Sequence, residues 1–354
     1  MNEAMTKPAL RDASAPFFRI GAAVSSRMVS GKELRDLICR HFSSLTADNQ
    51  MKPMFLLDRE STLAKGDPVR ASLRFDAADA LLSFARDAGI AMRFHTLVWH
   101  NQTPIWFFKD GWVDDRDAPF APREIMLARM ENYILDVMRH VNETFPGLVY
   151  TWDVVNEAIE PDHHAPGLFR TWSPWYAALG EDFLPAAFRA ARRGQAPGQT
   201  LCYNDYNAFQ PVKRDAIIVQ LKQLLKEDLV DTMGMQGHYV LADMDVPACE
   251  KAARAYAALG LNLQVTELDI HCTRSDGQGQ QELADAYGAY FDMLVRLCRE
   301  GIPIEAVTFW GVTDADSWLS GFRRERSYPL LFADDMQPKP AFDAVLNALE
   351  ARGE

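Results

Sequence analysis

The sequence lacks the cysteine patterns that mark zinc sites and disulfide scaffolds. Its five cysteines are odd in number, widely scattered and without a CxxC pair. They are Cys39, Cys202, Cys249, Cys272 and Cys298. We therefore expect no metal site and no disulfide framework, and we expect reduced thiols, which are typical of a cytoplasmic protein.

Long apolar runs and excess positive charge are also missing. Charged residues, among them Arg11, Asp12 and Arg19, interrupt the N-terminal segment, so no apolar stretch of signal-peptide length is present there. No apolar run elsewhere approaches the length of a membrane helix. The net charge of −12 disfavours nucleic acid and anionic membranes as partners, because both would be repelled at long range. These absences predict a cytoplasmic protein without a membrane or nucleic-acid partner.

Short strand-like runs alternate with longer helical ones along the whole chain. The strand candidates span residues 16–24, 42–47, 91–99, 148–156, 200–205, 232–238, 262–269 and 304–311. Eight strands, each followed by a helix, predict a closed (β/α)8 TIM barrel of the α/β class, as a single domain over residues 16–354 after an N-terminal extension at residues 1–15. An open doubly wound sheet is the alternative. It is disfavoured because no GxGxxG or GxxxxGK[ST] phosphate loop follows an early strand.

Several predicted helices carry recognisable end signals. Asp76 is expected to cap the helix that closes at Gly89, and Pro122 and Pro211 are expected in the first turns of two later helices. A further helix begins near Gln281 and is expected to end at Gly301.

Polar residues cluster at the C-terminal ends of the predicted strands. They are Asp48, Asn49, Lys52, His95, Trp99, His100, Gln102, Asn156, Glu157, Asn204, Asp205, Gln236, His238, Glu267, Asp269, Trp310 and Trp318. In a barrel these ends surround one mouth, where active sites of this fold are built. The set holds carboxylates, amides, imidazoles and indoles, with one lysine and no arginine. Sugar hydroxyls bond such polar groups and sugar C–H faces stack on indoles, so a carbohydrate pocket is predicted.

Glu157 and Glu267 are the best candidates for the chemistry. Each is expected one or two residues past a run of β-branched and aromatic residues. A carboxyl group placed where a strand opens into a loop can face a substrate, whereas burial inside the run would carry a large desolvation cost. Two such groups acting on one bond are what acetal hydrolysis requires. Taken alone, Glu157 would more often be a solvated carboxylate at a helix start.

Eight motifs in order resemble the family 10 glycoside hydrolases, the retaining endo-β-1,4-xylanases. They are TADNQMK (46–52), FHTLVWHNQ (94–102), WDVVNE (152–157), CYNDYN (202–207), GMQGH (234–238), VTELDI (265–270), TFWGVTDADSW (308–318) and PLLF with PKPAF (329–342). The resemblance runs from about Phe18 to Leu349. It implies a (β/α)8 barrel that needs no cofactor and acts on xylan-derived oligosaccharides.

The resemblance also implies roles for individual residues. Glu157 would be the acid/base and Glu267 the nucleophile, with their carboxyl groups about 5 to 5.5 Å apart. His238, hydrogen-bonded to Glu267 and oriented by Asp269, would keep the nucleophile ionised. Asn156 would bond the sugar 2-hydroxyl. The remaining implied substrate-binding residues are Asp48, Asn49, Lys52, His95, Trp99, Gln102, Asn204, Tyr206, Gln236, Trp310 and Trp318.

Three positions depart from the family pattern: Asp48 replaces Glu, Pro53 replaces Trp and Phe94 replaces Gly. They bear on distal sugar affinity and not on the reaction. A β-1,4-glucanase or aryl β-glycosidase on the same scaffold and a catalytically idle sugar-binding barrel are the other functions considered. Trp152 is expected to be structural, and the basic run at 323–329 is expected to be a solvated loop or a rim of the cleft.

Overall fold

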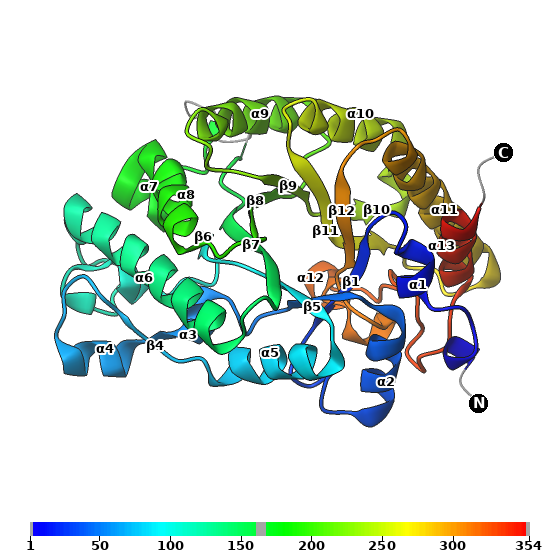
Figure 1. Cartoon of the computed structure of the whole chain (residues 1–354), viewed down its shortest axis with the longest axis horizontal. Helices are drawn as coiled ribbons and strands as arrows, with labels where there is room; N and C mark the ends of the chain where they lie inside the picture. The colour runs from blue at the N-terminus through cyan, green and yellow to red at the C-terminus, as the bar shows by residue number, and fades with distance from the viewer. Residues whose placement is uncertain (1–2, 161–167, 352–354) are drawn as a thin grey trace. The chain divides into compact units, whose positions relative to one another are not determined.

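The computed structural model describes residues 3–160 and 168–351. The chain divides into two compact units that are interleaved in sequence. The first unit contains Met1–Thr46, Tyr206–Gln210 and Met233–Glu354, and the second contains Ala47–Asp205 and Pro211–Thr232. Each unit combines parallel strands with helices that are adjacent to them in sequence (Figure 1).

The first unit holds a parallel sheet whose strands are almost completely buried. Its strands are β1 (Arg19–Val24), β2 (Ser44–Ala47), β10 (His238–Val240), β11 (Asn262–His271) and β12 (Ile304–Phe309), and most of β9 (Thr232–Met235) also belongs to it. The register pairs Ile20 with Val307 and His238 with Asp269. That second pair places two predicted site residues side by side on neighbouring strands.

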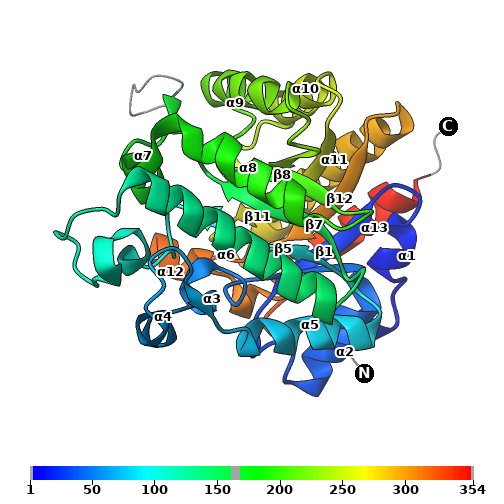
Figure 2. The same cartoon turned by 60° about the vertical axis from the view of Figure 1, so that its left-hand side comes forward.

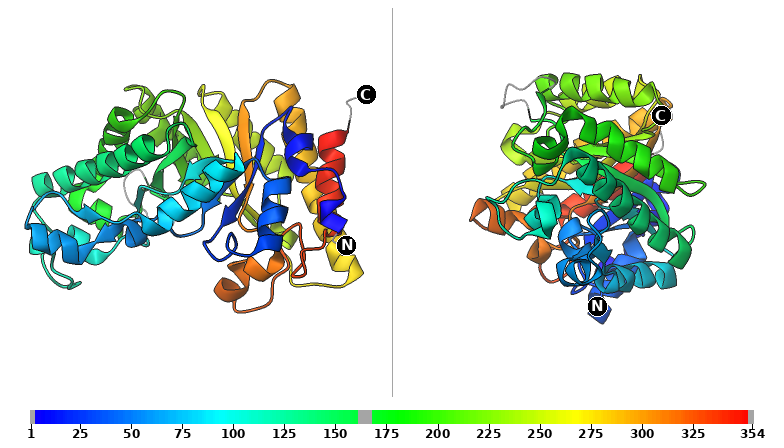
Figure 3. Two further views of the ribbon diagram at one scale, coloured as in Figure 1. Left: turned by 60° about the horizontal axis from the view of Figure 1, so that its bottom comes forward. Right: turned by 90° about the vertical axis from the view of Figure 1, so that its left-hand side faces the viewer.

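The α-helices of the first unit precede and follow its strands in sequence. They are α1 (Leu10–Ser14), α2 (Lys32–His41), α10 (Val246–Ala257), α11 (Gly277–Arg299), α12 (Leu319–Arg323) and α13 (Pro340–Glu350). Helix α13 packs along α11, and α1 packs against α13 and α2 (Figure 3). Leu10 and Ala4 are fully buried. Residues 3–15 therefore pack closely on this unit, and the boundary between an extension and a barrel at residue 16 stays a prediction.

The second unit has its own parallel strands and a small antiparallel pair. The parallel strands are β5 (Ala91–Phe94), β6 (Val98–Trp99), β7 (Val149–Asn156) and β8 (Thr200–Asp205), and the antiparallel pair is β3 (Leu57–Asp58) with β4 (Ser72–Leu73). The register pairs Trp99 with Asn156 and Asn156 with Asn204. Three predicted site residues thus form one row across neighbouring strand ends.

Helices cover this second set of strands. They are α3 (Pro53–Leu56), α4 (Arg59–Lys65), α5 (Asp76–Ala88), α6 (Arg123–Thr144), α7 (Pro174–Leu179), α8 (Phe183–Gly194) and α9 (Pro211–Leu225). Helices α6 and α8 lie side by side (Figure 2). Within the described ranges no helix has both the length and the apolar character needed to cross a bilayer.

Some predicted element ends are wrong in detail. Asp76 is the first residue of α5 and follows the cap position, which Phe75 occupies without a side-chain hydrogen bond. Pro122 is likewise the cap of α6. Helix α11 starts four residues before Gln281, because Asp276 accepts a hydrogen bond from the Gly279 N–H and caps it. The predicted ends at Gly89 and the start at Pro211 are confirmed.

Two predicted strands are each divided into two. Residues 91–99 form β5 and β6, and residues 232–238 contribute to β9 and β10. Gly237 separates the second pair with φ +86°, a left-handed backbone that glycine adopts without strain. A Cβ there would meet Val265 Cγ1 at 3.1 Å, so the glycine also lets this backbone approach β11 closely.

Candidate functional site

Glu157 follows the last residue of β7 directly and has an unusual backbone. Its φ is +57°, a conformation that non-glycine residues rarely adopt and that is found preferentially at functional sites. Its N–H donates to the Asn204 carbonyl oxygen at 2.9 Å, and its own carbonyl oxygen accepts from Arg170 Nε at 3.1 Å. These backbone hydrogen bonds hold the residue in the strained turn.

The carboxyl group of Glu157 contacts an indole and lies close to an imidazole. Oε2 accepts a hydrogen bond from Trp99 Nε1 at 2.9 Å and lies 3.9 Å from His100 Nδ1. Burial, together with the nearby charges of Arg170 and Lys213, lowers the pKa of His100 to about 3. His100 is therefore neutral near pH 7 and gives Glu157 no full positive charge.

The row of strand-end residues beside Glu157 is connected by an amide hydrogen bond. Asn204 Nδ2 donates to Asn156 Oδ1 at 2.8 Å, and both side chains are buried. The bond holds the two amide groups in a fixed orientation relative to each other, with Asn156 Oδ1 facing Asn204.

A second polar group of the same unit follows β2. Lys52 Nζ and Gln102 Nε2 both donate to Asn49 Oδ1, at 3.3 and 3.0 Å, and Asn49 Nδ2 donates to Asp48 Oδ2 at 2.7 Å. The Lys52 ammonium also lies 5.0 Å from the centre of a Trp99 ring. The structure thus brings together five of the predicted substrate-binding residues in one network.

His95 is almost completely buried and lies against a carboxylate. Its side chain is 2% exposed, and its Nδ1 lies 2.7 Å from Asp153 Oδ2, which also accepts from Arg93. The expected contact between His95 and sugar hydroxyls stays a prediction.

Glu267 lies inside β11, which continues to His271, so the expectation that the strand opens into a loop at Glu267 is wrong. The pairing of β11 with β12 shifts register between Val265 and Leu268, and this irregularity contains Glu267. Its N–H donates to the Gln236 carbonyl oxygen at 2.7 Å, and the residue is 5% exposed. A local break in the ladder therefore replaces the loop that the sequence suggested.

His238 bridges two carboxylates of β11. Nε2 lies 3.1 Å from Glu267 Oε2, and Nδ1 lies 2.8 Å from Asp269 Oδ1. Burial alone would lower the pKa of His238, but the charge of Asp269 and the hydrogen bonds to Asp269 and Glu267 outweigh it and raise the pKa to about 10. His238 is thus an imidazolium near pH 7, and each of its nitrogens donates to a carboxylate.

Two indoles lie close to this imidazolium. Trp318 Nε1 donates to Asp269 Oδ2 at 2.9 Å, and its ring meets the His238 ring edge-on with centres 5.0 Å apart. The Trp310 ring centre lies 6.3 Å from that of His238, and the residue is 8% exposed. Tyr206 begins the short segment after β8 that belongs to this unit, and Gln236 is 2% exposed.

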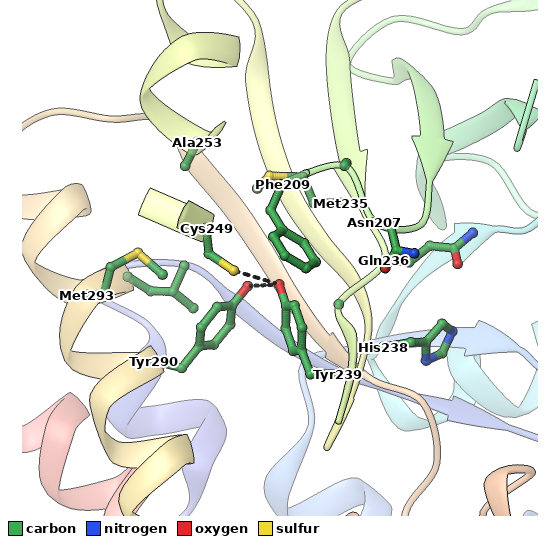
Figure 4. Close-up of a pocket in the computed structure, with 13 residues that line it drawn as sticks. Asn207, Phe209, Met235, Gln236, His238, Tyr239, Cys249, Ala253, Tyr290 and Met293 are labelled. Carbon is green, nitrogen blue, oxygen red and sulfur yellow. Dashed lines mark hydrogen bonds between the residues drawn. The ribbon is translucent and has the colours of Figure 1, made fainter. Parts of the chain in front are cut away.

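A cavity of about 10 Å³ lies between the segment that contains His238 and the helices α10 and α11. Figure 4 shows Tyr239, Tyr290 and Cys249 joined by hydrogen bonds there, with His238 and Gln236 directed away from them. Tyr239 Oη lies 3.2 Å from Tyr290 Oη and 3.3 Å from Cys249 Sγ. This buried chain anchors the backbone next to His238.

Arg170 was missing from the predicted site, and the prediction of a site without arginine is wrong. Arg170 is 6% exposed, contacts the Glu157 backbone and pairs with Glu160 at 2.9 Å. It lies 13 residues after Glu157 in no recognisable strand run, so strand-end spacing could not find it. His100 was among the predicted strand-end residues but had no assigned role, and its position 3.9 Å from Glu157 Oε2 now gives it one beside that carboxyl group.

Across residues 3–160 and 168–351, no group of three or more His, Cys, Asp or Glu side chains is arranged to hold a metal ion. The groups available for chemistry are carboxyl groups that accept hydrogen bonds from indole and imidazolium donors, with amide side chains beside them. Together with parallel strands that alternate with helices, this defines a carbohydrate-active enzyme of the α/β class.

Comparison with known proteins agrees with that class. The model of glycosyl hydrolase family 10 matches residues 9–348, and the chain belongs to this family. It is 42% identical over 345 residues to endo-1,4-beta-xylanase B of Butyrivibrio fibrisolvens, covering 96% of this chain and 53% of that protein. It is 36% identical to endo-1,4-beta-xylanase B of Paenibacillus barcinonensis, covering 96% of this chain and 98% of the relative.

A solved structure of an endo-1,4-beta-D-xylanase from Clostridium thermocellum, complexed with xylohexaose, matches with a TM-score of 0.88 and 33% identity, over 96% of this chain and 67% of that one. The intracellular xylanase of Thermoanaerobacterium saccharolyticum, complexed with xylotriose, matches with a TM-score of 0.84 and 32% identity, over 96% and 98%. The fold is the predicted (β/α)8 barrel, which excludes the doubly wound sheet. The chain spans 53% of the Butyrivibrio protein and 30% of a Thermotoga maritima xylanase.

Proposed function

We propose that the protein is an endo-1,4-β-xylanase that hydrolyses xylan fragments and xylooligosaccharides with retention of anomeric configuration. Membership of glycosyl hydrolase family 10 supports a glycosidase, and the printed names of the relatives support xylan as the substrate class. The strongest structural support is the pair of hydrogen bonds that His238 makes to Glu267 and Asp269. A cationic donor favours the ionised form of Glu267, which a covalent mechanism needs.

In the proposed first step, Glu267 attacks the anomeric carbon as Glu157 gives its proton to the departing glycosidic oxygen. The C–O bond to the leaving sugar breaks, and a glycosyl ester forms on Glu267. In the second step Glu157 takes a proton from water, the water oxygen attacks the anomeric carbon, and Glu267 leaves as a carboxylate. Two inversions give net retention, and a carboxyl separation of about 5 to 5.5 Å is predicted.

The surroundings of the two glutamates suit different roles. Glu267 has an imidazolium donor at 3.1 Å, which favours its charged form. Glu157 has an indole donor at 2.9 Å and an imidazole at 3.9 Å that is neutral near pH 7, so neither of these two neighbours is a cation. This contrast supports Glu267 as nucleophile and Glu157 as acid/base.

The polar network after β2 supports sugar binding. Lys52 and Gln102 both donate a hydrogen bond to Asn49 Oδ1. This shared acceptor orients the other N–H groups of the two side chains. Asn156, fixed by Asn204, is proposed to bond the 2-hydroxyl of the reacting sugar, a contact that strengthens as oxocarbenium character develops. The indoles of Trp99, Trp310 and Trp318 are proposed to pack on sugar faces.

We further propose a cytoplasmic location. All five cysteines are free thiols, which suits a reducing compartment, and a structural neighbour is named an intracellular xylanase. Imported oligosaccharides would then be the substrates, since polymeric xylan does not cross a membrane.

The test is product analysis on defined ladders of xylooligosaccharides and cellooligosaccharides. The proposal predicts cleavage of internal xylosidic bonds and much slower turnover of the cello series. Comparable rates on both series would instead identify a β-1,4-glucanase or broad β-glycosidase. Xylotetraose left intact after overnight incubation, but bound with measurable affinity, would identify a sugar-binding barrel and overturn the proposal.

A further inference from the structure

An exposed aromatic pair extends outward from the Glu267 cluster. The Phe322 ring lies 4.7 Å from the Trp318 ring with a 42° angle between the planes. Phe322 is 68% exposed and Trp318 is 36% exposed. Trp318 is anchored by its hydrogen bond to Asp269 Oδ2, so the pair starts at the carboxylate that orients His238. Exposed aromatic surface that is contiguous and rimmed by polar residues is typical of a ligand-binding surface.

The residues that follow Phe322 carry positive charge. In the run 323–326, Glu325 lies 3.2 Å from His271 Nε2, and Arg326 donates to Asp334 Oδ2 at 2.6 Å while lying over Tyr328. Arg323 and Arg324 are exposed, and no ion pair joins either of them to a carboxylate in the described part of the chain. Two uncommitted guanidinium groups thus follow an exposed ring directly, in a chain whose net charge is −12.

The backbone separates these two arginines from the rest of the run. Helix α12 ends at Arg323, and Arg324 takes a left-handed conformation with φ +57°. The turn redirects the chain after Arg324, and Glu325 pairs with His271. Trp318, Phe322, Arg323 and Arg324 thus lie within seven consecutive residues, and we refer to these four residues as the platform.

We propose that Arg323 and Arg324 bind the carboxylate of a uronic acid substituent on a xylooligosaccharide, while Trp318 and Phe322 contact the sugar face beside it. This deepens the proposed function and rests on it. Guanidinium groups bind carboxylates with charge-assisted hydrogen bonds, and aromatic rings stack on sugar C–H faces. A neutral xylooligosaccharide would use the rings alone, whereas a uronic acid branch would use both halves of the platform.

The experiment compares two substrates of equal backbone length, a linear xylooligosaccharide and one that carries a single glucuronic acid branch. The measured quantity is the ratio of kcat/KM on the acidic substrate to that on the neutral one. We expect the double variant R323Q/R324Q to lower this ratio about fivefold, as expected for loss of exposed charge pairs. The ratio of the wild-type protein should also fall as salt rises, because the contacts are exposed.

A matched variant controls for net charge. K222Q/K251Q removes the same two positive charges from exposed positions on α9 and α10, and should leave the ratio unchanged. Phe322→Ala should raise KM on both substrates and leave most of the preference that the arginines provide. An unchanged ratio in R323Q/R324Q, or an equal fall in K222Q/K251Q, would overturn the proposal.

Binding measurements separate this inference from the proposed function. Calorimetry with Glu267→Ala and both oligosaccharides reports affinity without turnover, in the presence and absence of the arginine changes. If the wild-type protein cleaves neither substrate, the proposed function fails, while the calorimetric ratio still decides the role of the arginines. If cleavage occurs but the acidic ligand gains no affinity from Arg323 and Arg324, the inference alone fails.

Discussion

His238 Nε2 lies 3.1 Å from Glu267 Oε2, while Asp269 holds the opposite nitrogen of the same ring at 2.8 Å. Two carboxylates therefore share one imidazolium. The arrangement keeps Glu267 charged and fixes the direction of its carboxyl group. Both properties are needed of a nucleophile that must attack a carbon from one side.

Replacing His238 with glutamine should move the acidic limb of the pH profile upward. The variant keeps a hydrogen-bond donor but loses the positive charge, so Glu267 should stay ionised only at higher pH. We expect a shift of about one pH unit in the acidic limb of kcat/KM. His140→Gln is the matched control, because His140 also pairs with a carboxylate, Asp79 at 2.9 Å, on another part of the chain. A limb that stays in place in His238→Gln would contradict the role given to the imidazolium.

Replacing Trp99 with phenylalanine should impair proton donation more than binding. The change removes the donor that contacts Glu157 Oε2 at 2.9 Å and keeps an aromatic ring in its place. A misoriented acid matters most when the leaving group needs a proton. We therefore expect kcat to fall about tenfold further on an aryl xyloside with a poor leaving group than on one with a good leaving group. Equal losses on the two substrates would show that the hydrogen bond does not serve the acid.

Acid should destabilise the packing of the N-terminal segment through His41. His41 is fully buried, Nε2 donates to the Ala4 carbonyl oxygen at 2.9 Å, and Nδ1 accepts from the Leu10 N–H. Burial lowers the pKa of His41 from 6.5 to about 4 despite that hydrogen bond to Ala4. The folded pKa is depressed, so the neutral ring contributes stability that is present above pH 6.5 and is lost as pH falls through about 4.

The measurement is urea unfolding of the wild type and His41→Gln at several pH values between 7 and 4. The stability advantage of the wild type should shrink over this range, by up to about 3 kcal/mol. The variant lacks the titrating ring and should show a flatter pH dependence. A constant difference between the two proteins would mean that His41 does not titrate as its burial implies.

The alternation of strands and helices could be predicted because most strands are rich in apolar and β-branched residues. The candidate at 200–205 coincides with β8, and the one at 148–156 lies within one residue of β7. The predicted positions of strand ends were less accurate where the backbone is irregular, as at Gly237 and around Glu267. Periodicity carries no signal for a register shift within a ladder, because the side-chain pattern on either side of it looks continuous.

Site residues were predictable where they lie in compact motifs near strand ends. Trp99, Asn156 and Asn204 fall in one row because their strands are adjacent and in register. Arg170 could not be predicted, since its contact with the Glu157 carbonyl depends on the path of the chain after β7. The neutral state of His100 was equally inaccessible, because it results from burial and from nearby cations.

The most direct test of the central claim is to trap the glycosyl-enzyme. A 2-deoxy-2-fluoro xylobioside with a good leaving group should glycosylate the nucleophile, with release of that leaving group, and the glycosyl-enzyme should turn over slowly. Peptide mass mapping would then locate the added sugar. The account predicts the label on the peptide that contains Glu267 and none on the peptide that contains Glu157. A label on Glu157, or active protein that gains no mass while the leaving group is released, would contradict it.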